Sequence, residues 1–113
     1  MLKLIVAVKR KRGMSVEEFH DHWSTVHAHL IKTIPVCRRY IRKYIQCHTV
    51  PEEYASGDVP CDGTAEVWFD SVADKEAFFH HPEYLAKIRP DELFFADLEK
   101  TKFFITREEH ILP

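Results

Sequence analysis

Apolar residues along the chain follow two kinds of spacing, one typical of strands and one typical of helices. Residues 2–9 are dense in Leu, Ile and Val and predict a first strand, and residues 64–70 and 100–107 predict two more. Residues 36–50 predict a long strand between them, because residues 40–47 alternate between apolar and polar positions. The pattern therefore predicts four strands.

Residues 15–31 predict the first helix. Ser15 lies three residues before Glu18, which is the spacing of a capping box, and Pro35 follows the end of the helix. Residues at helical spacing form one apolar face, which consists of Val16, Phe19, Trp23, Val26 and Leu30. His27 lies near the centre of that face, so we expect its ring beneath the helix; His22 and His29 share one flank and His20 the other.

The rest of the chain completes a simple order of elements. Residues 51–63 are rich in Pro, Gly and Asp and predict a polar loop. Ser71 caps a second helix that runs to residue 79, and short helical segments follow at residues 83–88 and 90–95. The order strand–helix–strand–strand–helix–strand predicts an α+β, ferredoxin-like fold with an antiparallel four-stranded sheet, formed by residues 1–113 as one domain.

Both faces of the predicted sheet carry apolar side chains. Leu4 and Val6 alternate with Ile5 and Ala7, and the last strand has adjacent phenylalanines. Helices cover only one face in this fold, so the other face calls for a partner. We expect a homodimer that packs sheet to sheet.

Composition narrows the functional classes. The formal net charge is −2, so no excess of basic residues indicates binding to nucleic acid or to an anionic membrane. No apolar stretch approaches the roughly 20 residues that span a bilayer, and no leader is apparent. The three cysteines are odd in number and lack metal-type spacing, which favours a reduced, cytoplasmic protein.

Metal, phosphate and nucleophile motifs are missing from the sequence. The helix pairs His20/His27 and His22/His29 are seven residues apart, whereas two metal ligands on one helix face are best placed four apart. The chain has three glycines and no phosphate-binding loop, and no cysteine occupies a helix N-terminus. We therefore expect no metal and no bound cofactor, although one histidine could still bind haem.

His27 is the first candidate for acid–base chemistry, because a buried imidazole can titrate near neutral pH. The alternative is a hydrogen-bonded core residue. Glu66 and Trp68 share one side of a strand; the carboxylate could be a buried acid or an exposed ion-pair partner, and the indole could stack on a substrate or pack in an interface. His81 could lie at the mouth of a substrate pocket, or it could cap the end of a helix.

Three segments resemble the EthD-domain family. They are the first-helix set Phe19, Trp23, His27 and Ala28, the strand at residues 66–71, and the acidic–aromatic turn that contains Asp91, Glu92, Phe95 and Asp97. The resemblance implies a dimeric α/β barrel. It does not imply one reaction, since relatives include methylmuconolactone isomerases and polyketide dehydratases and cyclases.

The resemblance also implies positions for the site. A pocket histidine and tyrosine of the isomerases correspond by spacing to His27 and Tyr40, and a further pocket histidine corresponds loosely to His48. A cysteine of those isomerases is replaced by Val67, which argues against the same isomerisation. The predicted site thus has His27 and Tyr40 as catalytic residues, and the predicted substrate contacts are His22, His48, Glu66, Trp68 and His81.

These residues support one leading hypothesis and two alternatives. The leading hypothesis is a cofactor-independent acid–base enzyme, a dehydratase, isomerase or cyclase, whose substrate is a hydrophobic oxygenated aromatic, polyketide or lactone. The first alternative is a cofactor-free monooxygenase of quinol-type substrates. The second is a non-catalytic protein that binds a small molecule.

Overall fold

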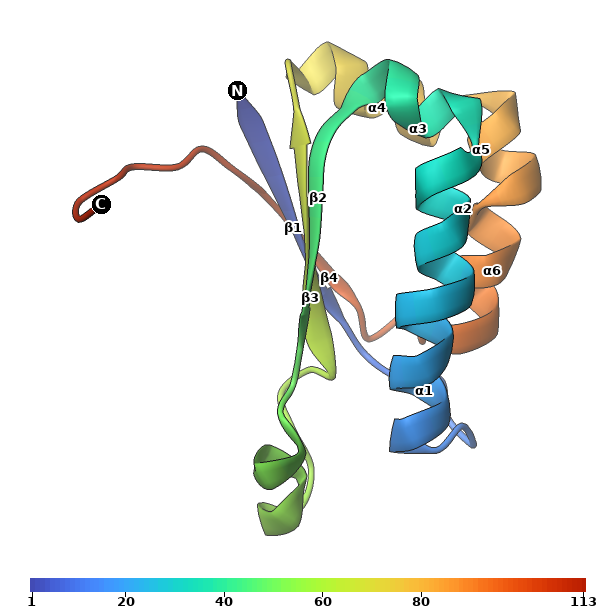
Figure 1. Cartoon of the computed structure of the whole chain (residues 1–113), viewed down its shortest axis with the longest axis vertical. Helices are drawn as coiled ribbons and strands as arrows, with labels where there is room; N and C mark the ends of the chain where they lie inside the picture. The colour runs from blue at the N-terminus through green and yellow to red at the C-terminus, as the bar shows by residue number, and fades with distance from the viewer.

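The computed structural model describes all 113 residues and forms one antiparallel sheet with a layer of helices on one face (Figure 1). The strand order in the sheet is β2-β3-β1-β4. The strands are β1 (Leu2–Val8), β2 (Ile41–His48), β3 (Gly63–Phe69) and β4 (Lys102–Thr106). The predicted α+β, ferredoxin-like architecture is confirmed.

Seven helical segments make up the layer on the sheet. They are α1 (Val16–His22), η1 (Trp23–His27), α2 (Ala28–Thr33), α3 (Pro35–Tyr40), α4 (Val72–Phe79), α5 (Pro82–Lys87) and α6 (Arg89–Phe95). The predicted caps are present: Ser15 accepts a hydrogen bond from the Glu18 N–H, and Ser71 accepts one from the Asp74 N–H. Each cap satisfies a backbone donor that the first helical turn leaves free.

The first helical rod is not a uniform α-helix, which corrects the predicted apolar face. The segment η1 is a turn of π-helix, in which the backbone bonds run from residue i to residue i+5. This wider turn rotates the positions that follow it relative to an α-helix. Phe19 and Trp23 are buried as expected, but Val26 is exposed.

The predicted strand over residues 36–50 begins later than the pattern indicated. Residues 35–40 form the helix α3, since Pro35 at the first helical position has the φ angle that a helix requires. Val36 and Cys37 are buried, and the Val36 N–H donates to Glu83 at 2.8 Å, so packing outweighs the alternating pattern. The predicted loop at residues 51–63 contains a short 3₁₀ helix, η2 (Pro51–Ser56), which lies below the lower end of the sheet in the view of Figure 1.

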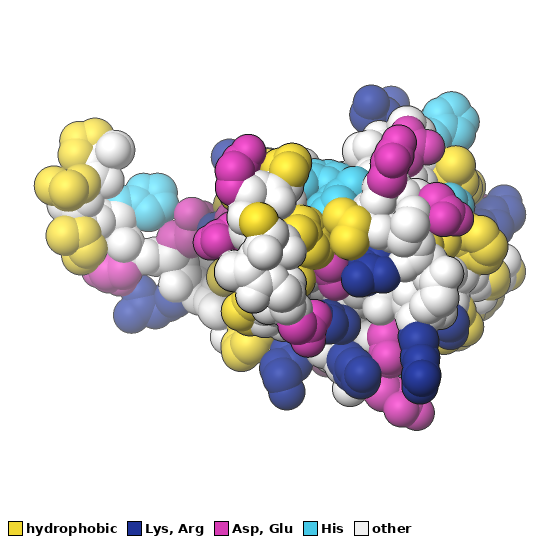
Figure 2. Space-filling model, turned by 90° about the horizontal axis from the view of Figure 1, so that it is seen from below, with side chains coloured by type: hydrophobic (Ala, Val, Ile, Leu, Met, Phe, Trp, Pro, Cys, Tyr) yellow, Lys and Arg dark blue, Asp and Glu magenta, His cyan; other side chains and the backbone are white.

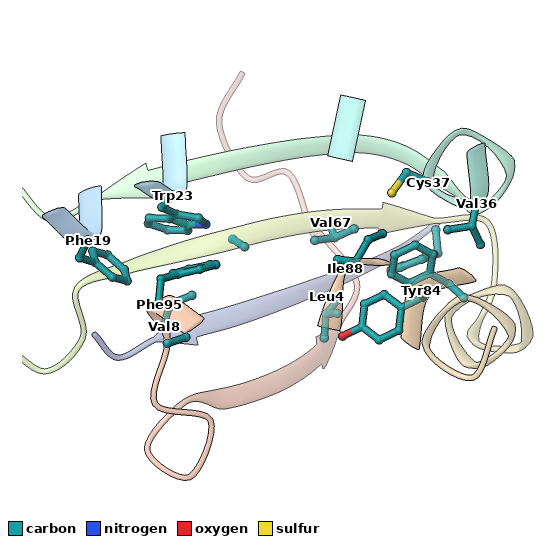
Figure 3. Packing of buried hydrophobic residues seen from close by; sticks show 14 residues of the cluster. Leu4, Val8, Phe19, Trp23, Val36, Cys37, Val67, Tyr84, Ile88 and Phe95 are labelled. Atoms are coloured by element: carbon teal, nitrogen blue, oxygen red, sulfur yellow. The ribbon is translucent and has the colours of Figure 1, made fainter. Parts of the chain in front are cut away.

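The hydrophobic core lies between the sheet and the helices (Figure 3). Trp23 and Phe95 pack near one end, and Tyr84 and Ile88 pack toward the other. Trp23 can approach the sheet because Gly63 has no side chain: a Cβ there would lie 2.5 Å from the Trp23 ring. This close approach brings the first helical rod down onto β3.

The other face of the sheet is not covered by helices (Figure 1). Its side chains include Ile5, Ile45 and Phe104, and the last two are exposed. The C-terminal tail leaves β4 on this side and extends away from the body of the chain. None of the helices has the length and apolar character needed to cross a membrane.

Candidate active site

A cavity opens between the sheet and the helical layer. Its volume is about 620 Å³, which includes the open mouth. Most of the lining is apolar and includes Leu4, Val6, Val8, Trp23, Val67, Phe78 and Phe95. The polar side chains in the lining are His27, Tyr44, Glu92 and Thr101, so the cavity suits a compact apolar molecule with a few polar groups.

His27 is held by a carboxylate. Its Nδ1 atom lies 3.0 Å from Asp91 Oδ2, and the other carboxylate oxygen lies 2.7 Å from His22 Nε2. Burial alone raises the pKa of Asp91, but the hydrogen bonds and charges of the two histidines outweigh it, so that pKa lies below its ordinary value. An ionised Asp91 must accept both bonds, which places a proton on His27 Nδ1.

The tautomer of His27 follows from this bond. With a proton on Nδ1, the neutral ring keeps its lone pair on Nε2. That atom makes no hydrogen bond within the protein, and His27 lines the cavity while being only 3 % exposed overall. The carboxylate thus orients the imidazole and leaves Nε2 able to accept a proton, an arrangement that hydrolytic triads also use.

The π-turn explains why two histidines reach one carboxylate. His22 and His27 are five residues apart, and on an α-helix they would point about 140° away from each other. In a turn with i-to-i+5 bonds, residues at that spacing lie above one another. The wider turn thus aims both rings at Asp91, which α6 supplies.

Glu92 provides a second titratable group in the cavity. Burial raises the pKa of its carboxyl group, although a hydrogen bond from Tyr84, the charge that His27 carries when it is protonated, and the nearby Arg89 all oppose that shift. The Arg89 Nε atom lies 3.3 Å from Glu92 Oε1. The raised pKa favours the protonated carboxyl, which can donate a proton, whereas His27 can accept one.

Tyr44 is a third polar group in the lining. Burial raises the pKa of its phenol to about 12, so the hydroxyl stays neutral and can donate a hydrogen bond to a ligand. A base, an acid and a neutral donor in an apolar cavity can move a proton between carbon and oxygen of a bound molecule. No group of three His, Cys, Asp or Glu side chains is arranged to hold a metal ion.

The structure does not form the predicted His27–Tyr40 pair. Tyr40 is the last residue of α3, not a strand residue, and its ring centroid lies 6.4 Å from that of His81. The chain turns between the helix and β2 at this point, so the phenol stays outside the cavity. His81 caps α5, where its Nδ1 accepts a hydrogen bond from the Glu83 N–H.

The other predicted substrate contacts also lie outside the cavity. His22 is the second partner of Asp91, and His48 bonds to His20 at the lower end of the sheet. Glu66 and Trp68 point from β3 to the uncovered face of the sheet, because their side chains alternate with the buried Val67. There Glu66 pairs with Lys3 at 2.5 Å, and the Trp68 indole donates to Glu108.

Asp91, Glu92 and Tyr44 were not among the predicted site residues. Asp91 and Glu92 lie in the acidic–aromatic turn that carried the family resemblance, so a sequence signal pointed to their segment and not to their roles. Tyr44 lies four residues after Tyr40 along the chain. The choice between them depended on where β2 begins, which the alternating pattern placed too early.

Comparison with protein families gives one match. The model of the EthD domain matches residues 11–99. That range contains His27, Tyr44, Asp91 and Glu92. Comparison with curated proteins gives no match.

Solved structures with the same fold cover nearly the whole chain. An EthD-family protein of Bacillus halodurans has a TM-score of 0.70 at 21 % identity, covering 96 % of this chain and 99 % of its own. A dimeric ferredoxin-like protein of unknown function from Bacteroides fragilis has a TM-score of 0.68 at 19 % identity, with 95 % of each chain covered. A hydroxynitrile lyase from Passiflora edulis has a TM-score of 0.66 at 19 % identity, covering 99 % of this chain and 96 % of its own. At these identities the similarity shows the fold.

Proposed function

This chain belongs to the EthD domain family, and on that premise we propose that it is an acid–base enzyme that moves protons on a small apolar carbonyl compound. The observation that carries the proposal is the buried His27, which is hydrogen-bonded to Asp91 and presents Nε2 to an apolar cavity. The hydroxynitrile lyase of Passiflora edulis supports it, since a lyase occurs on the same fold.

The proposed reaction begins with removal of a proton from carbon. His27 Nε2 takes a proton from the carbon next to the carbonyl, and the electron pair of that C–H bond moves to the carbonyl oxygen. Glu92 gives its proton to that oxygen, and Tyr44 donates a hydrogen bond to it. The resulting enol can then be protonated at another carbon, lose a hydroxide as water, or close a ring, so isomerase, dehydratase and cyclase outcomes share this first step.

The cavity restricts the class of substrate. Apolar side chains form most of the lining, so binding favours an uncharged molecule with a hydrophobic ring or chain. The titratable groups in the lining come from α6, η1 and β2, and we propose that together they orient one oxygenated group of the substrate. We therefore propose a lactone or a small aromatic or polyketide ketone as the substrate.

Deuterium exchange tests this function without knowledge of the physiological product. We expect the protein in D₂O to exchange the acidic C–H protons of compact lactones and aryl ketones faster than buffer does, as measured by NMR or mass spectrometry. The His29→Gln variant serves as a control, because His29 is exposed on α2 and should leave the rate unchanged. Binding of these compounds without exchange would instead support a non-catalytic binding protein.

We also propose that two copies of the chain pack together through the uncovered face of the sheet. Ile45 and Phe104 are 38 % and 48 % exposed there, and burying such side chains gains roughly 25 cal/mol per Å². The dimeric protein from Bacteroides fragilis has the same fold, which supports this arrangement.

Substitution of Phe104 tests the dimer. We expect light scattering to give twice the chain mass for the wild type and the mass of a monomer for Phe104→Lys, since the new charge would be buried in the interface. Leu85→Lys is the matched control, because Leu85 is 47 % exposed on α5, in the helical layer. A dimeric Phe104→Lys variant would place the interface elsewhere.

A further inference from the structure

A second group of polar side chains lies at the lower end of the molecule, outside the cavity. His20 Nδ1 lies 2.7 Å from His48 Nδ1, and His20 Nε2 lies 2.9 Å from the Tyr54 hydroxyl. The Tyr54 hydroxyl lies 2.8 Å from Asp62 Oδ1, and at the other end His48 Nε2 lies 2.8 Å from Gln46 Oε1. These four contacts form one continuous chain from Gln46 to Asp62.

Both ends of this chain are acceptors. The amide group of Gln46 has a fixed orientation, because its Nε2 donates a hydrogen bond to the Trp23 carbonyl at 2.9 Å, and turning the amide around would break that bond. Its oxygen therefore faces His48. Asp62 is 1 % exposed and accepts a bond from the Arg10 backbone N–H at 2.7 Å, with the Arg10 guanidinium 3.6 Å away, so its carboxyl group faces donors at the far end of the chain.

The number of protons does not match the number of contacts. Four hydrogen bonds between acceptors at both ends require four protons. Two neutral imidazoles and one phenol supply three. We propose that His20 and His48 are a binding site for one additional proton, shared between their Nδ1 atoms, which completes the chain.

The shared position follows from the outer partners of the two rings. In the completed chain His48 uses its Nε2–H to bind Gln46, and His20 uses its Nε2–H to bind Tyr54, whose own proton goes to Asp62. Both Nδ1 lone pairs then point at each other across 2.7 Å, a distance that one intervening proton turns into a hydrogen bond. Without it, two lone pairs face each other and one of the four contacts must break.

The surroundings decide the pH at which the proton is bound. Burial against Phe19 and Trp23 lowers the pKa of both rings, the charge of Asp62 raises the pKa of His20, and Arg10 lowers it. Glu17 and Asp21 of α1 line the same groove, and Tyr54 faces it from η2. The pair therefore takes up its proton on mild acidification, below the ordinary histidine pKa of about 6.5. A second added proton would place two cations in contact and is excluded.

Proton uptake has a mechanical consequence. Histidine side chains lie in the hollow between η2 and α1 (Figure 2). Apart from the half-buried Tyr54, the residues of η2 are exposed, so the contacts of Tyr54 with His20 and Asp62 tie this segment to the rest of the chain. With the additional proton bound, the hydrogen bonds of Tyr54 hold η2 against α1. When the proton is lost, one of the four contacts breaks and η2 is held less firmly.

Nitrogen-detected NMR of the histidine side chains tests the proposal. We expect His20 and His48 to take up one proton together as the pH falls. In the protonated form, both Nε2 atoms should carry a proton and the two Nδ1 atoms should share a single signal. His29 is the internal control, since it is exposed on α2 and lies outside the chain of contacts. Backbone hydrogen exchange in residues 51–56 should slow at the same pH as the pair is protonated.

Two variants should move the transition in opposite directions. Gln46→Glu replaces a neutral acceptor by an anion and should raise the apparent pKa of the pair by about one unit. Tyr54→Phe removes two of the four contacts and leaves two bonds, which the two protons of neutral rings can satisfy, so it should lower that pKa. Circular dichroism checks that both variants are folded.

The proposal fails if His20 and His48 titrate independently of each other, or if both variants leave the titration unchanged. It also fails if Zn²⁺ at neutral pH shifts both Nδ1 signals at equimolar concentration, since the pair would then be a metal site and not a proton site. The deuterium-exchange assay of the cavity tests a different proposal, because none of the side chains in the chain from Gln46 to Asp62 lines the cavity. Failure of one proposal therefore leaves the other intact.

Discussion

Replacing His27 with Gln should lower the rate of deuterium exchange by about 10²–10⁴-fold, the contribution that a positioned general base usually makes. Gln has no group that can take a proton from carbon, yet its amide can still donate a hydrogen bond to Asp91. The side chain fits a similar volume beneath η1, so we expect the variant to fold. The measurement is the initial exchange rate on the best compound from the screen, with the dissociation constant of that compound determined in parallel.

The comparison of rate and binding separates a chemical role from a structural one. A loss of rate with unchanged binding means that His27 acts in the proton transfer, whereas a parallel loss of both means that it only shapes the cavity. His29→Gln, at an exposed position of α2, should behave like the wild type in both measurements. Unaltered exchange in His27→Gln would remove His27 from the mechanism.

Replacing Asp91 with Asn should reduce the same rate by about 10²-fold or more, which corresponds to about 2.7 kcal/mol of transition-state stabilisation. The carboxylate accepts bonds from both His22 and His27, but an amide has one oxygen and can accept from only one ring without a rearrangement. The variant also loses the negative charge that stabilises the imidazolium formed when His27 takes a proton.

Stability against pH gives this prediction a second readout. The pKa of Asp91 is lowered in the folded chain, so its ionised form contributes stability above the ordinary Asp pKa of about 3.9. That contribution is lost as the pH falls through the lowered value. The wild type should therefore lose stability over this acidic range, and Asp91→Asn should lose less there, as measured by urea unfolding. Asp70→Asn is the control, because Asp70 is exposed and pairs with Arg42 at the surface. Equal acid sensitivity in wild type and Asp91→Asn would contradict the assigned role of Asp91.

The proton site and the cavity lie on opposite sides of Trp23. Its ring packs against His48, with 4.5 Å between the two centroids, and also lines the cavity, while its carbonyl accepts a hydrogen bond from Gln46. Trp23 can come this close to the sheet only because position 63 is a glycine. One tight packing contact thus separates two groups of histidines that the sequence places on a single helix.

Local rules determined much of this protein from the sequence. The capping serines fixed where two helices begin, and the density and alternation of apolar residues fixed three of the four strands and their order with the helices. The burial of His27 followed from its place near the apolar face of the first helix. These features depend on neighbours within about one helical turn or a few strand residues, so periodicity and propensity are enough to find them.

Only the tertiary structure decided which side chains meet. The π-turn that aims His22 and His27 at Asp91 leaves no clear signal in the residues of η1, and Asp91 itself lies 64 residues beyond His27. Tyr44 lines the cavity and Tyr40 does not, because residues 35–40 form a helix that buries Val36 and Cys37, and β2 begins only at Ile41. The chain from Gln46 to Asp62 joins four separate segments in the same way. Contacts between distant segments depend on the packing of the whole core, which no local pattern encodes.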